Sequence, residues 1–464
     1  MSPASPSGSR PGSPSGPPPE IASESRDATD ATPADVAFAP AASVHANAAP
    51  SADFDGSDAR GAPRGHAVRA LIASIAGYAM DGFDLLMLGF MLPAISADLH
   101  LSGAQAGSLV TWTLVGAVVG GIVFGLLSDR FGRVRVLTWT ILLFAVFTGL
   151  CALSRGYADL LVYRTIAGIG LGGEFGIGMA LVAEAWPARL RARASSYVGL
   201  GWQAGVLAAA LLTPWLLPVI GWRGMFAVGL LPALASFFVR RRVEEPDMFV
   251  AHRERVAQAA PQDKPRALRL LVADARTARA SLGVAVLCSV QNFGYYGLMI
   301  WLPAYLAKSF GYSLTKSGLW TAATVAGMAL GIWLFGVAAD RFGRRPAFLF
   351  YQAGAVAMVF VYAQLSTPFA LLIGGAAMGV FVNGMIGGYG ALISELYPTA
   401  ARATAQNVLF NIGRAVGGFG PLAVGAVAAR YSFATALAML ASIYVLDILA
   451  TLFLIPERRG AALD

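Results

Sequence analysis

The stretch GLLSDRFGR at residues 125–133 returns as GVAADRFGR at residues 336–344, displaced by 211 positions. A second set of three residues recurs at the same displacement, Glu184, Pro187 and Arg191 returning as Glu395, Pro398 and Arg402. Similarity at one fixed offset indicates an internal repeat. The chain is therefore predicted to consist of two related halves.

The composition of the 464-residue chain is that of a membrane protein. Hydrophobic residues make up 56% of the chain, charged residues only 13%, and the mean hydropathy is +0.62, which is too apolar for an ordinary soluble domain. A helix that crosses the bilayer needs about 20 mostly apolar residues. Twelve such stretches are predicted, at residues 68–95, 104–126, 134–153, 158–182, 195–219, 223–241, 281–306, 315–338, 346–365, 368–393, 404–429 and 432–455. The predicted fold class is an all-α membrane protein with twelve transmembrane helices in two bundles of six.

Changes in composition divide the chain into five parts. Residues 1–66 are rich in Ser, Pro, Ala, Gly and Asp and lack a sustained apolar run, which predicts a disordered tail. Four arginines against eight acidic residues in that tail argue against a signal peptide, whose apolar core follows basic residues. The two six-helix bundles are predicted at residues 67–241 and 281–457. Residues 242–280 between them form a charged cytoplasmic linker, and residues 458–464 form a short C-terminal tail.

Arginines are concentrated in alternate loops. Cytoplasmic loops carry an excess of Lys and Arg, so these loops are predicted to face the cytoplasm, with both termini on that side and the chain in the inner membrane. The clusters are Arg130, Arg133 and Arg135; Arg189, Arg191 and Arg193; Arg240, Arg241 and Arg242; and Arg341, Arg344 and Arg345. The net charge is +8, but the arginines lie in short loops rather than on one basic face, so no nucleic-acid partner is expected.

The repeated run, G-x-x-x-D-R-x-G-R after the second and eighth predicted spans, resembles the loop motif of the major facilitator superfamily. The segments GYAMDGFD at 77–84, GGEFG at 172–176 and GWR at 221–223 are similar to those of sialate:proton symporters, and the DGFD element also resembles aromatic-acid:proton symporters. The resemblance covers residues 68–459. It implies the major facilitator fold and proton-coupled uptake of a small organic anion, such as an aromatic or other monocarboxylic acid, by alternating access. We expect a monomer whose partners are the anion, protons and the lipid bilayer, with no cofactor and no metal.

The two copies of the loop motif are predicted to form a gate rather than a substrate contact. Gly125 and Gly132 permit close helix approach and a tight turn, and Asp129 can accept hydrogen bonds from helix N-termini or from nearby arginines. Salt bridges of this kind can hold the cytoplasmic face shut and then release it, and the resemblance implies the same role in the second half. The predicted gating residues are Gly125, Asp129, Arg130, Gly132, Arg133, Glu184, Arg191, Gly336, Asp340, Arg341, Gly343, Arg344, Glu395 and Arg402.

Three carboxylates within the predicted spans are candidates for carrying the coupled proton. A charge at bilayer depth is costly unless it is paired or faces water, so such residues are functional candidates. Asp81 and Asp84 lie three residues apart on one helix face, which raises the proton affinity of each. Glu174 in the fourth span is the third candidate, with a buried ion pair to Arg164 or to another helix as the alternative. No histidine lies within a predicted span, so proton coupling is assigned to carboxylates.

Two intramembrane arginines are candidates for binding the anion. A guanidinium forms two parallel hydrogen bonds with a carboxylate, and Arg414 in span eleven is the preferred ligand, with Asn411 on the same helix face. The 211-residue offset places Gln203, an uncharged residue that is also a predicted substrate contact, opposite Arg414, so the charge belongs to one half only. Arg414 could instead neutralise an aspartate of span one, and Arg164 could be a packing partner of the same acids.

Predicted span seven carries two amides and two tyrosines on adjacent stripes. Each amide precedes a tyrosine by four residues, which places the members of each pair on one helix face. Such a surface suits a polar or aromatic ligand. The four residues are Gln291, Asn292, Tyr295 and Tyr296, and they complete the predicted substrate contacts.

Other functions remain as alternatives. The main alternative is a proton-coupled antiporter or exporter of a small metabolite. The Gly-Pro-rich run that is typical of the fifth span in drug:proton antiporter families is absent, because residues 201–205 read GWQAG. A membrane sensor is expected to show a partner-binding pattern in residues 1–66, and none is visible. An enzyme needs a metal-ligand cluster, a nucleotide loop or a Ser-His-Asp arrangement at membrane depth, and the sequence has none. Uptake of an organic anion is therefore the leading prediction.

Overall fold

The computed structural model describes residues 65–240, 243–258, 267–311, 314–459 and 463. In this part of the chain the secondary structure consists of α-helices and one 3₁₀ turn, without a β-strand. The predicted all-α fold class is therefore confirmed. The predicted N-terminal tail lies outside the described residues except for its last two, which already belong to the first helix.

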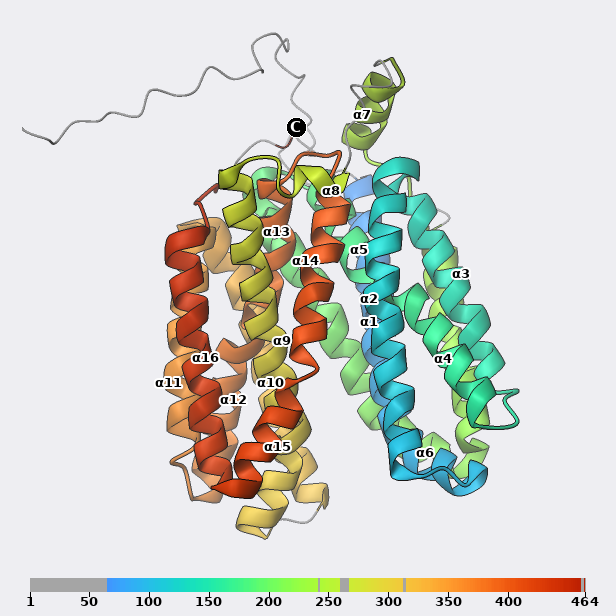
Figure 1. Ribbon diagram of the computed structural model, residues 1–464, viewed down its shortest axis with the longest axis vertical. Helices are drawn as coiled ribbons and strands as arrows, with labels where there is room; N and C mark the ends of the chain where they lie inside the picture. The colour runs from blue at the N-terminus through green and yellow to red at the C-terminus, as the bar shows by residue number, and fades with distance from the viewer. Residues whose placement is uncertain (1–64, 241–242, 259–266, 312–313, 460–462, 464) are drawn as a thin grey trace, which may run out of the picture. The chain divides into compact units, whose positions relative to one another are not determined.

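The first half of the repeat forms α1 to α6 (Figure 1). The predicted span 158–182 consists of two helices, α4 and α5, which are separated by Gly173. The last two predicted spans of this half run together in α6, which changes direction at Gly221 with a φ of 66°, a conformation that glycine adopts without steric cost. The elements are α1 (Gly65–Leu99), α2 (Gly103–Phe131), α3 (Arg133–Cys151), α4 (Tyr157–Gly172), α5 (Glu174–Ala185), the 3₁₀ turn η1 (Ala188–Leu190) and α6 (Arg191–Arg240).

The linker and the second half form the remaining helices. Of the predicted linker, residues 242 and 259–266 lie outside the described residues, and the rest contains α7 (Asp247–Gln258), α8 (Ala267–Leu270) and the start of α9. The predicted spans 368–393 and 404–429 are each divided into two helices, as span 158–182 is. The elements of this half are α9 (Ala275–Phe310), α10 (Leu314–Phe342), α11 (Arg344–Tyr362), α12 (Pro368–Gly384), α13 (Ile386–Leu396), α14 (Arg402–Gly417), α15 (Gly420–Arg430) and α16 (Phe433–Leu454).

Nine helical segments of the described chain are long and apolar enough to cross a bilayer. They correspond to nine of the twelve predicted spans. Of the other three, span 223–241 is the end of α6, whose side chains from residue 231 onward are not described. Span 346–365 is α11, which begins with two arginines, and span 404–429 is divided between α15 and the polar helix α14. The count of twelve therefore stays a prediction, whereas the helical membrane fold is established.

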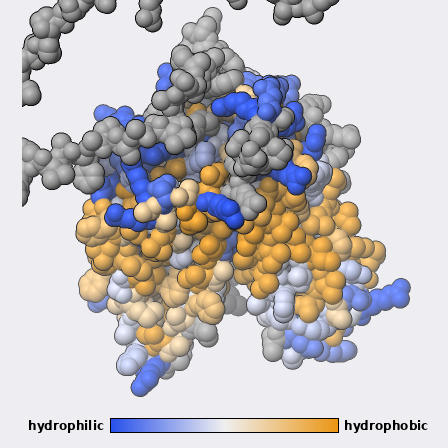
Figure 2. All heavy atoms as spheres, turned by 45° about the horizontal axis from the view of Figure 1, so that its top comes forward, coloured by the Kyte–Doolittle hydropathy of each residue, from blue (hydrophilic) through white to orange (hydrophobic). Residues whose placement is uncertain are grey.

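The outer surface of the helices is apolar. Large exposed apolar side chains occur on helices of both halves, among them Leu142, Val146, Leu449 and Phe453. Figure 2 shows hydrophobic residues across the middle of the face that it draws, with hydrophilic residues gathered toward its two ends. Exposed apolar surface of this extent is unfavourable in water. The surface is instead suited to contact with lipid tails.

Glycines bring neighbouring helices into backbone contact in both halves. A Cβ atom on Gly120 would lie 1.9 Å from the carbonyl oxygen of Ile169, so α2 and α4 have no room for a larger residue at this crossing. The helices α10 and α12 meet in the same way, because a Cβ atom on Gly331 would lie 2.1 Å from the carbonyl oxygen of Val380. Small residues at crossings permit close helix packing in membranes. Gly120 and Gly331 are 211 positions apart, so the repeat in the sequence is also a repeat in helix packing.

The two halves lie side by side, with α1 to α6 on one side and α9 to α16 on the other (Figure 1). The helix α2 packs against α14, and α10 packs against α6. The described helices belong to one compact unit. Each half thus meets the other through an equivalent pair of helices.

We expect Gly132→Ala to destabilise the fold. Gly132 separates α2 from α3 with a φ of 111°, and a Cβ atom on it would lie 2.4 Å from a carboxylate oxygen of Glu245. A residue other than glycine held in such a conformation costs about 1 to 3 kcal/mol. Thermal unfolding of the detergent-solubilised protein can be followed with a thiol-reactive dye, because Cys151 and Cys288 are both buried.

The matched control for this substitution is Gly107→Ala in α2. A Cβ atom on Gly107 would meet nothing within 4 Å, and alanine favours the helix more than glycine does. The unfolding midpoint should fall for Gly132→Ala and should stay the same or rise for Gly107→Ala. Equal midpoints for the two variants would contradict the packing described for the turn between α2 and α3.

Candidate functional site

The repeated loop motif lies at one end of the helices, which we call the arginine-rich end, and joins the two halves there. Asp129, near the end of α2, accepts hydrogen bonds at 3.2 and 2.8 Å from two backbone N–H groups in the first turn of α14. Asp340, near the end of α10, accepts hydrogen bonds at 3.1 and 3.0 Å from the first turn of α6. These N–H groups have no partner within their helix and carry the positive end of its dipole. Each aspartate therefore caps a helix of the other half.

Buried arginine–glutamate contacts reinforce these caps. Arg133 donates to Glu184 through Nε and Nη2 at 3.2 and 2.9 Å, and Arg402 of the other half donates to the same carboxylate at 2.9 Å. The second half repeats the pattern, at 2.7 to 3.1 Å, with Arg344, Glu395 and Arg191. We call these six residues, together with Asp129 and Asp340, the charged latch. Removing one partner of a buried ion pair is strongly destabilising, so the closed latch holds the halves together at the arginine-rich end.

Two acidic residues that were not predicted from the sequence complete this end. Glu245, just beyond α6, accepts hydrogen bonds at 2.8 and 3.1 Å from the backbone of the first turn of α3. Glu457, just beyond α16, accepts hydrogen bonds at 3.2 and 2.8 Å from the first turn of α11. The two glutamates are 212 positions apart. This near match to the repeat is the signal that would have identified them.

Two of the predicted gating arginines lie outside the charged latch. Arg130 and Arg341 are exposed, and each guanidinium lies over the ring of the next residue, at 5.2 and 5.4 Å from the centres of Phe131 and Phe342. The motif thus contributes its second arginine, and not its first, to the contact between the halves.

The four predicted gating glycines have two different tasks. Gly125 and Gly336 face the other half, because a Cβ atom on them would lie 3.1 Å from a side-chain atom of α14 and 2.4 Å from one of α6. Gly132 and Gly343 form the turns from α2 to α3 and from α10 to α11, with φ angles of 111° and 109°. The first pair permits close approach, and the second pair aims the following helix at its glutamate cap.

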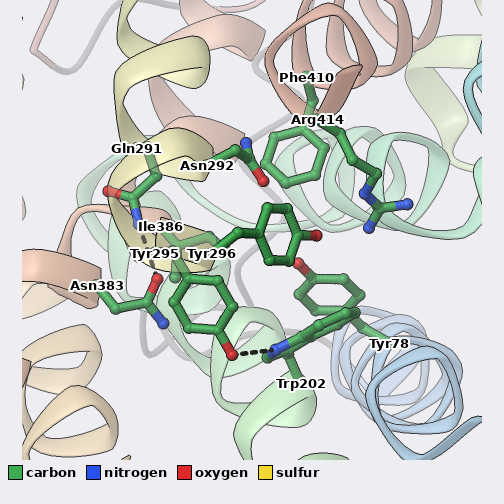
Figure 3. A pocket seen from close by; sticks show the side chains of 10 residues that line it. All are labelled: Tyr78, Trp202, Gln291, Asn292, Tyr295, Tyr296, Asn383, Ile386, Phe410 and Arg414. Atoms are coloured by element: carbon green, nitrogen blue, oxygen red, sulfur yellow. Dashed lines mark hydrogen bonds between the residues drawn. The ribbon is translucent and has the colours of Figure 1, made fainter. Parts of the chain in front are cut away.

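A small cavity lies among helices of both halves. Aromatic rings make up half of its lining, with three amides, one isoleucine and one arginine (Figure 3). An apolar cavity with a few polar groups is typical of small-molecule sites. The lining residues are Tyr78 of α1, Trp202 of α6, Gln291, Asn292, Tyr295 and Tyr296 of α9, Asn383 of α12, Ile386 of α13, and Phe410 and Arg414 of α14. The structure thus brings five of the eight predicted substrate contacts together and adds five residues that were not among them.

Two pairs of glycines bring the helices of this cavity together. A Cβ atom on Gly201 or Gly205 of α6 would lie 2.5 or 1.9 Å from a backbone oxygen of α1. One on Gly413 or Gly417 of α14 would lie 2.5 Å from atoms of α9. Close packing at both crossings holds the lining side chains of α6 and α14 beside those of α1 and α9.

These glycine pairs also correct the predicted register between the halves. They are 212 positions apart rather than 211, so the residue equivalent to Arg414 is Trp202 and not Gln203. Trp202 and Arg414 both line the cavity, whereas Gln203 is buried outside its lining. A single extra position in the second half, between the charged latch and the glycines, explains the difference.

Arg414 is the charged group of the cavity. It is 4% exposed, and its guanidinium carbon lies 6.0 and 5.6 Å from the ring centres of Trp202 and Phe410. Figure 3 shows the Tyr296 hydroxyl turned toward it. Within the described part of the chain it forms no ion pair, and its Nε has no hydrogen-bond partner. A buried cation with an unused donor favours an anionic ligand.

The two aspartates of α1 have different surroundings. Arg164 donates two hydrogen bonds to Asp84, at 2.9 and 2.7 Å, and both side chains are buried. Arg164 is therefore the packing partner of a first-span acid, one of its two predicted roles, and is not among the residues that line the cavity. Asp81 is 1% exposed and follows the lining residue Tyr78 by one turn. Its charge interacts with that of Arg414.

Two further predicted site residues lie away from the cavity lining. Glu174, at the start of α5, accepts a hydrogen bond from the Thr140 hydroxyl at 2.6 Å. The guanidinium of Arg164, its predicted alternative partner, is instead bound to Asp84. Asn411 donates to backbone oxygens of α14 and α4 at 2.9 and 3.4 Å, so it joins the halves beside the cavity.

Comparisons with known proteins point to membrane transport. The chain matches the family model described as Major Facilitator Superfamily over residues 75–327 and 284–463. A Haemophilus influenzae protein named "Putative metabolite transport protein" is 68% identical over 397 residues, which cover 85% of this chain and 98% of that protein.

Two relatives from Acinetobacter baylyi carry names with a cargo. The cis,cis-muconate transport protein is 30% identical over 376 residues, covering 81% of this chain and 91% of that protein. The 4-hydroxybenzoate transporter PcaK is 30% identical over 390 residues, covering 78% and 85%. Among solved structures, the proton:xylose symporter XylE matches with a TM-score of 0.72 at 20% identity, over 86% of this chain and 98% of the XylE chain. At that identity the likeness concerns the fold alone.

We expect Asp129→Asn to loosen the first turn of α14. Asparagine keeps an acceptor oxygen but loses the charge that interacts with the helix dipole. A weakened cap of about 0.5 to 2 kcal/mol corresponds to about 2- to 30-fold faster local opening. Hydrogen–deuterium exchange of the backbone amides of α14, read by mass spectrometry, measures this opening.

The matched control is Arg130→Gln, which changes an exposed residue of the same loop that lies outside the charged latch. It should leave the exchange of α14 unchanged. If Asp129→Asn also leaves that exchange unchanged, the aspartate does not cap α14 in solution.

Proposed function

Because the chain belongs to the Major Facilitator Superfamily, we propose that it couples the inward flow of protons to the uptake of a small organic anion. The chain is a multi-pass membrane transporter and not an enzyme. We place the arginine-rich end and both termini in the cytoplasm, because loops rich in arginine stay on that side of the inner membrane.

The observation that carries the proposal is Arg414 in a cavity walled by aromatic rings. The guanidinium is buried, forms no ion pair among the described residues and lies beside Trp202 and Phe410. A carboxylate would pair with it, while an unsaturated or aromatic body would pack on the rings. Cis,cis-muconate and 4-hydroxybenzoate, the cargo in the names of two relatives, are acids of this kind. They support an aromatic or other unsaturated carboxylate as the cargo.

Asp81 is the residue best placed to link proton binding to anion binding. Its negative charge and the carboxylate of a substrate would compete for the positive charge of Arg414. Protonation of Asp81 removes its charge, so it favours the anion, and loss of the proton favours release. Asp84 is a second candidate, but its charge is already balanced by Arg164.

Transport then follows from the closed latch and the central cavity. With the charged latch formed, the proposed cytoplasmic side is shut, and anion and proton reach the cavity from the opposite side. Opening the latch lets the halves rock about the cavity and release both on the inside. The site is in the position expected for alternating access, between two related halves.

We expect Arg414→Lys to weaken substrate binding. Lysine keeps the positive charge but loses the planar fork that pairs with a carboxylate, which should cost about 1 to 3 kcal/mol of binding free energy. Equilibrium binding of 4-hydroxybenzoate to the purified protein is the measurement. The control, Arg130→Lys, changes an exposed arginine far from the cavity lining. Unchanged affinity in Arg414→Lys would rule out this arginine as the anion ligand.

We expect Asp81→Asn to abolish uphill uptake while counterflow continues. The neutral amide imitates the protonated acid, so substrate can still be exchanged across the membrane but cannot be coupled to a proton gradient. Uptake and counterflow in proteoliposomes with an imposed pH gradient distinguish these outcomes. Asp84→Asn is a poorer test, because it would leave Arg164 buried without its partner.

A protonophore is the control on the wild-type protein and should abolish accumulation. Accumulation that survives the protonophore, or that requires sodium, would show that protons are not the energy source. Uphill uptake by Asp81→Asn would move the coupling role to Asp84 or Glu174.

A further inference from the structure

We infer that the amide pair formed by Gln291 and Asn383 binds the end of the substrate opposite its carboxylate and selects acids whose far end both donates and accepts a hydrogen bond. The inference rests on the proposed function and narrows its substrate class to carboxylates that carry a hydroxyl or a carboxamide at the other end. Asn383 was not among the residues predicted from the sequence.

The two amides are bonded to each other and each has one group left over. Gln291 of α9 donates through Nε2 to Oδ1 of Asn383 of α12 at 2.8 Å. Both side chains line the cavity and are 1% and 2% exposed. Among the described residues, Gln291 Oε1 and Asn383 Nδ2 have no hydrogen-bond partner. The pair thus holds one unused acceptor and one unused donor.

The number of unused donors and acceptors does not depend on how the two amide groups are oriented. If both amides are rotated by half a turn, Asn383 Nδ2 donates to Gln291 Oε1, and the groups left over become Gln291 Nε2 and Asn383 Oδ1. The remaining set is still one donor and one acceptor. The chemistry required of the ligand is therefore the same in both arrangements.

The amide pair and Arg414 lie on opposite sides of the cavity. Figure 3 shows Gln291 and Asn383 on one side, Arg414 on the other, and the rings of Tyr295 and Tyr296 between them. A planar acid held by its carboxylate at Arg414 would pass along these rings and bring its far end to the amides. A phenolic hydroxyl or a carboxamide can donate and accept at once, so it satisfies both amides.

The selection follows from the cost of a buried amide without a partner. An acid with a methyl group at its far end would displace water from the pair and leave both amide groups unsatisfied. A site built to bond a hydroxyl rejects an isosteric analogue that lacks it much more strongly than an apolar pocket does. The amide pair therefore selects the group at the far end of the acid, whereas Arg414 selects for its negative charge.

The test compares acids of nearly the same shape. Binding of benzoate, 4-methylbenzoate, 4-methoxybenzoate and 4-hydroxybenzoate to the purified full-length chain is measured by titration calorimetry. We expect 4-hydroxybenzoate to bind at least about tenfold more tightly than 4-methylbenzoate. We expect 4-methoxybenzoate, which accepts but cannot donate, to fall between them.

The variant is the double substitution Gln291→Leu with Asn383→Leu, which removes both amides and leaves no single amide unpaired. It should bring the affinities for the hydroxy and methyl acids to about the same value while 4-methylbenzoate still binds. The control is Arg130→Lys, at an exposed residue outside the cavity lining, which should preserve the preference for the hydroxyl.

The outcomes separate this inference from the proposed function. Equal affinity of the wild-type protein for 4-hydroxybenzoate and 4-methylbenzoate would overturn the inference, and this measurement needs no variant to fold. A preference that persists in the double variant would also overturn it. Failure to bind any of the four acids, or binding that is unaffected by Arg414→Lys, would instead overturn the proposed function.

Discussion

The arrangement of this protein depends on a carboxylate that caps a helix belonging to the other half. Asp129 and Asp340 each satisfy backbone N–H groups that their own half cannot reach. Buried polar groups are costly without partners, so when the caps break, water must take their place. Water can reach the helix ends only if the arginine-rich end opens. Release of the caps and opening of that end are therefore one event.

The features that sequence analysis found are those with strong patterns. The repeat of 125–133 at 336–344 located the charged latch, because both copies sit at helix ends that meet. Arg414 and the polar stripe of span seven were found because charged and amide groups are rare at membrane depth. The helical membrane fold was predicted from the long apolar runs, and the helices of the structure and the family match confirm it.

The features that were not predicted depend on contacts between residues that are far apart in the sequence. Glu245 and Glu457 lie in ordinary charged stretches, and their near match to the repeat relates them to each other without showing that they cap α3 and α11. Whether Arg164 lines the cavity or pairs with Asp84 depends on the direction of its side chain, which the sequence does not give. One inserted residue decides whether Gln203 or Trp202 is equivalent to Arg414, and counting along the sequence cannot locate that insertion. Asn383 was not identified from the sequence, where its partner, Gln291, is 92 residues away.

The polar groups that line the cavity all come from α9, α12 and α14 of the second half, apart from the Tyr78 hydroxyl and the Trp202 indole. The acids proposed to carry the proton all belong to the first half. In the proposed assignment, the first half therefore carries the proton and the second half binds the anion. Substitutions in the second half can then change which anion is bound, while the proton-binding residues of the first half stay the same. A transporter of this kind can acquire a new substrate and keep its coupling to the proton gradient.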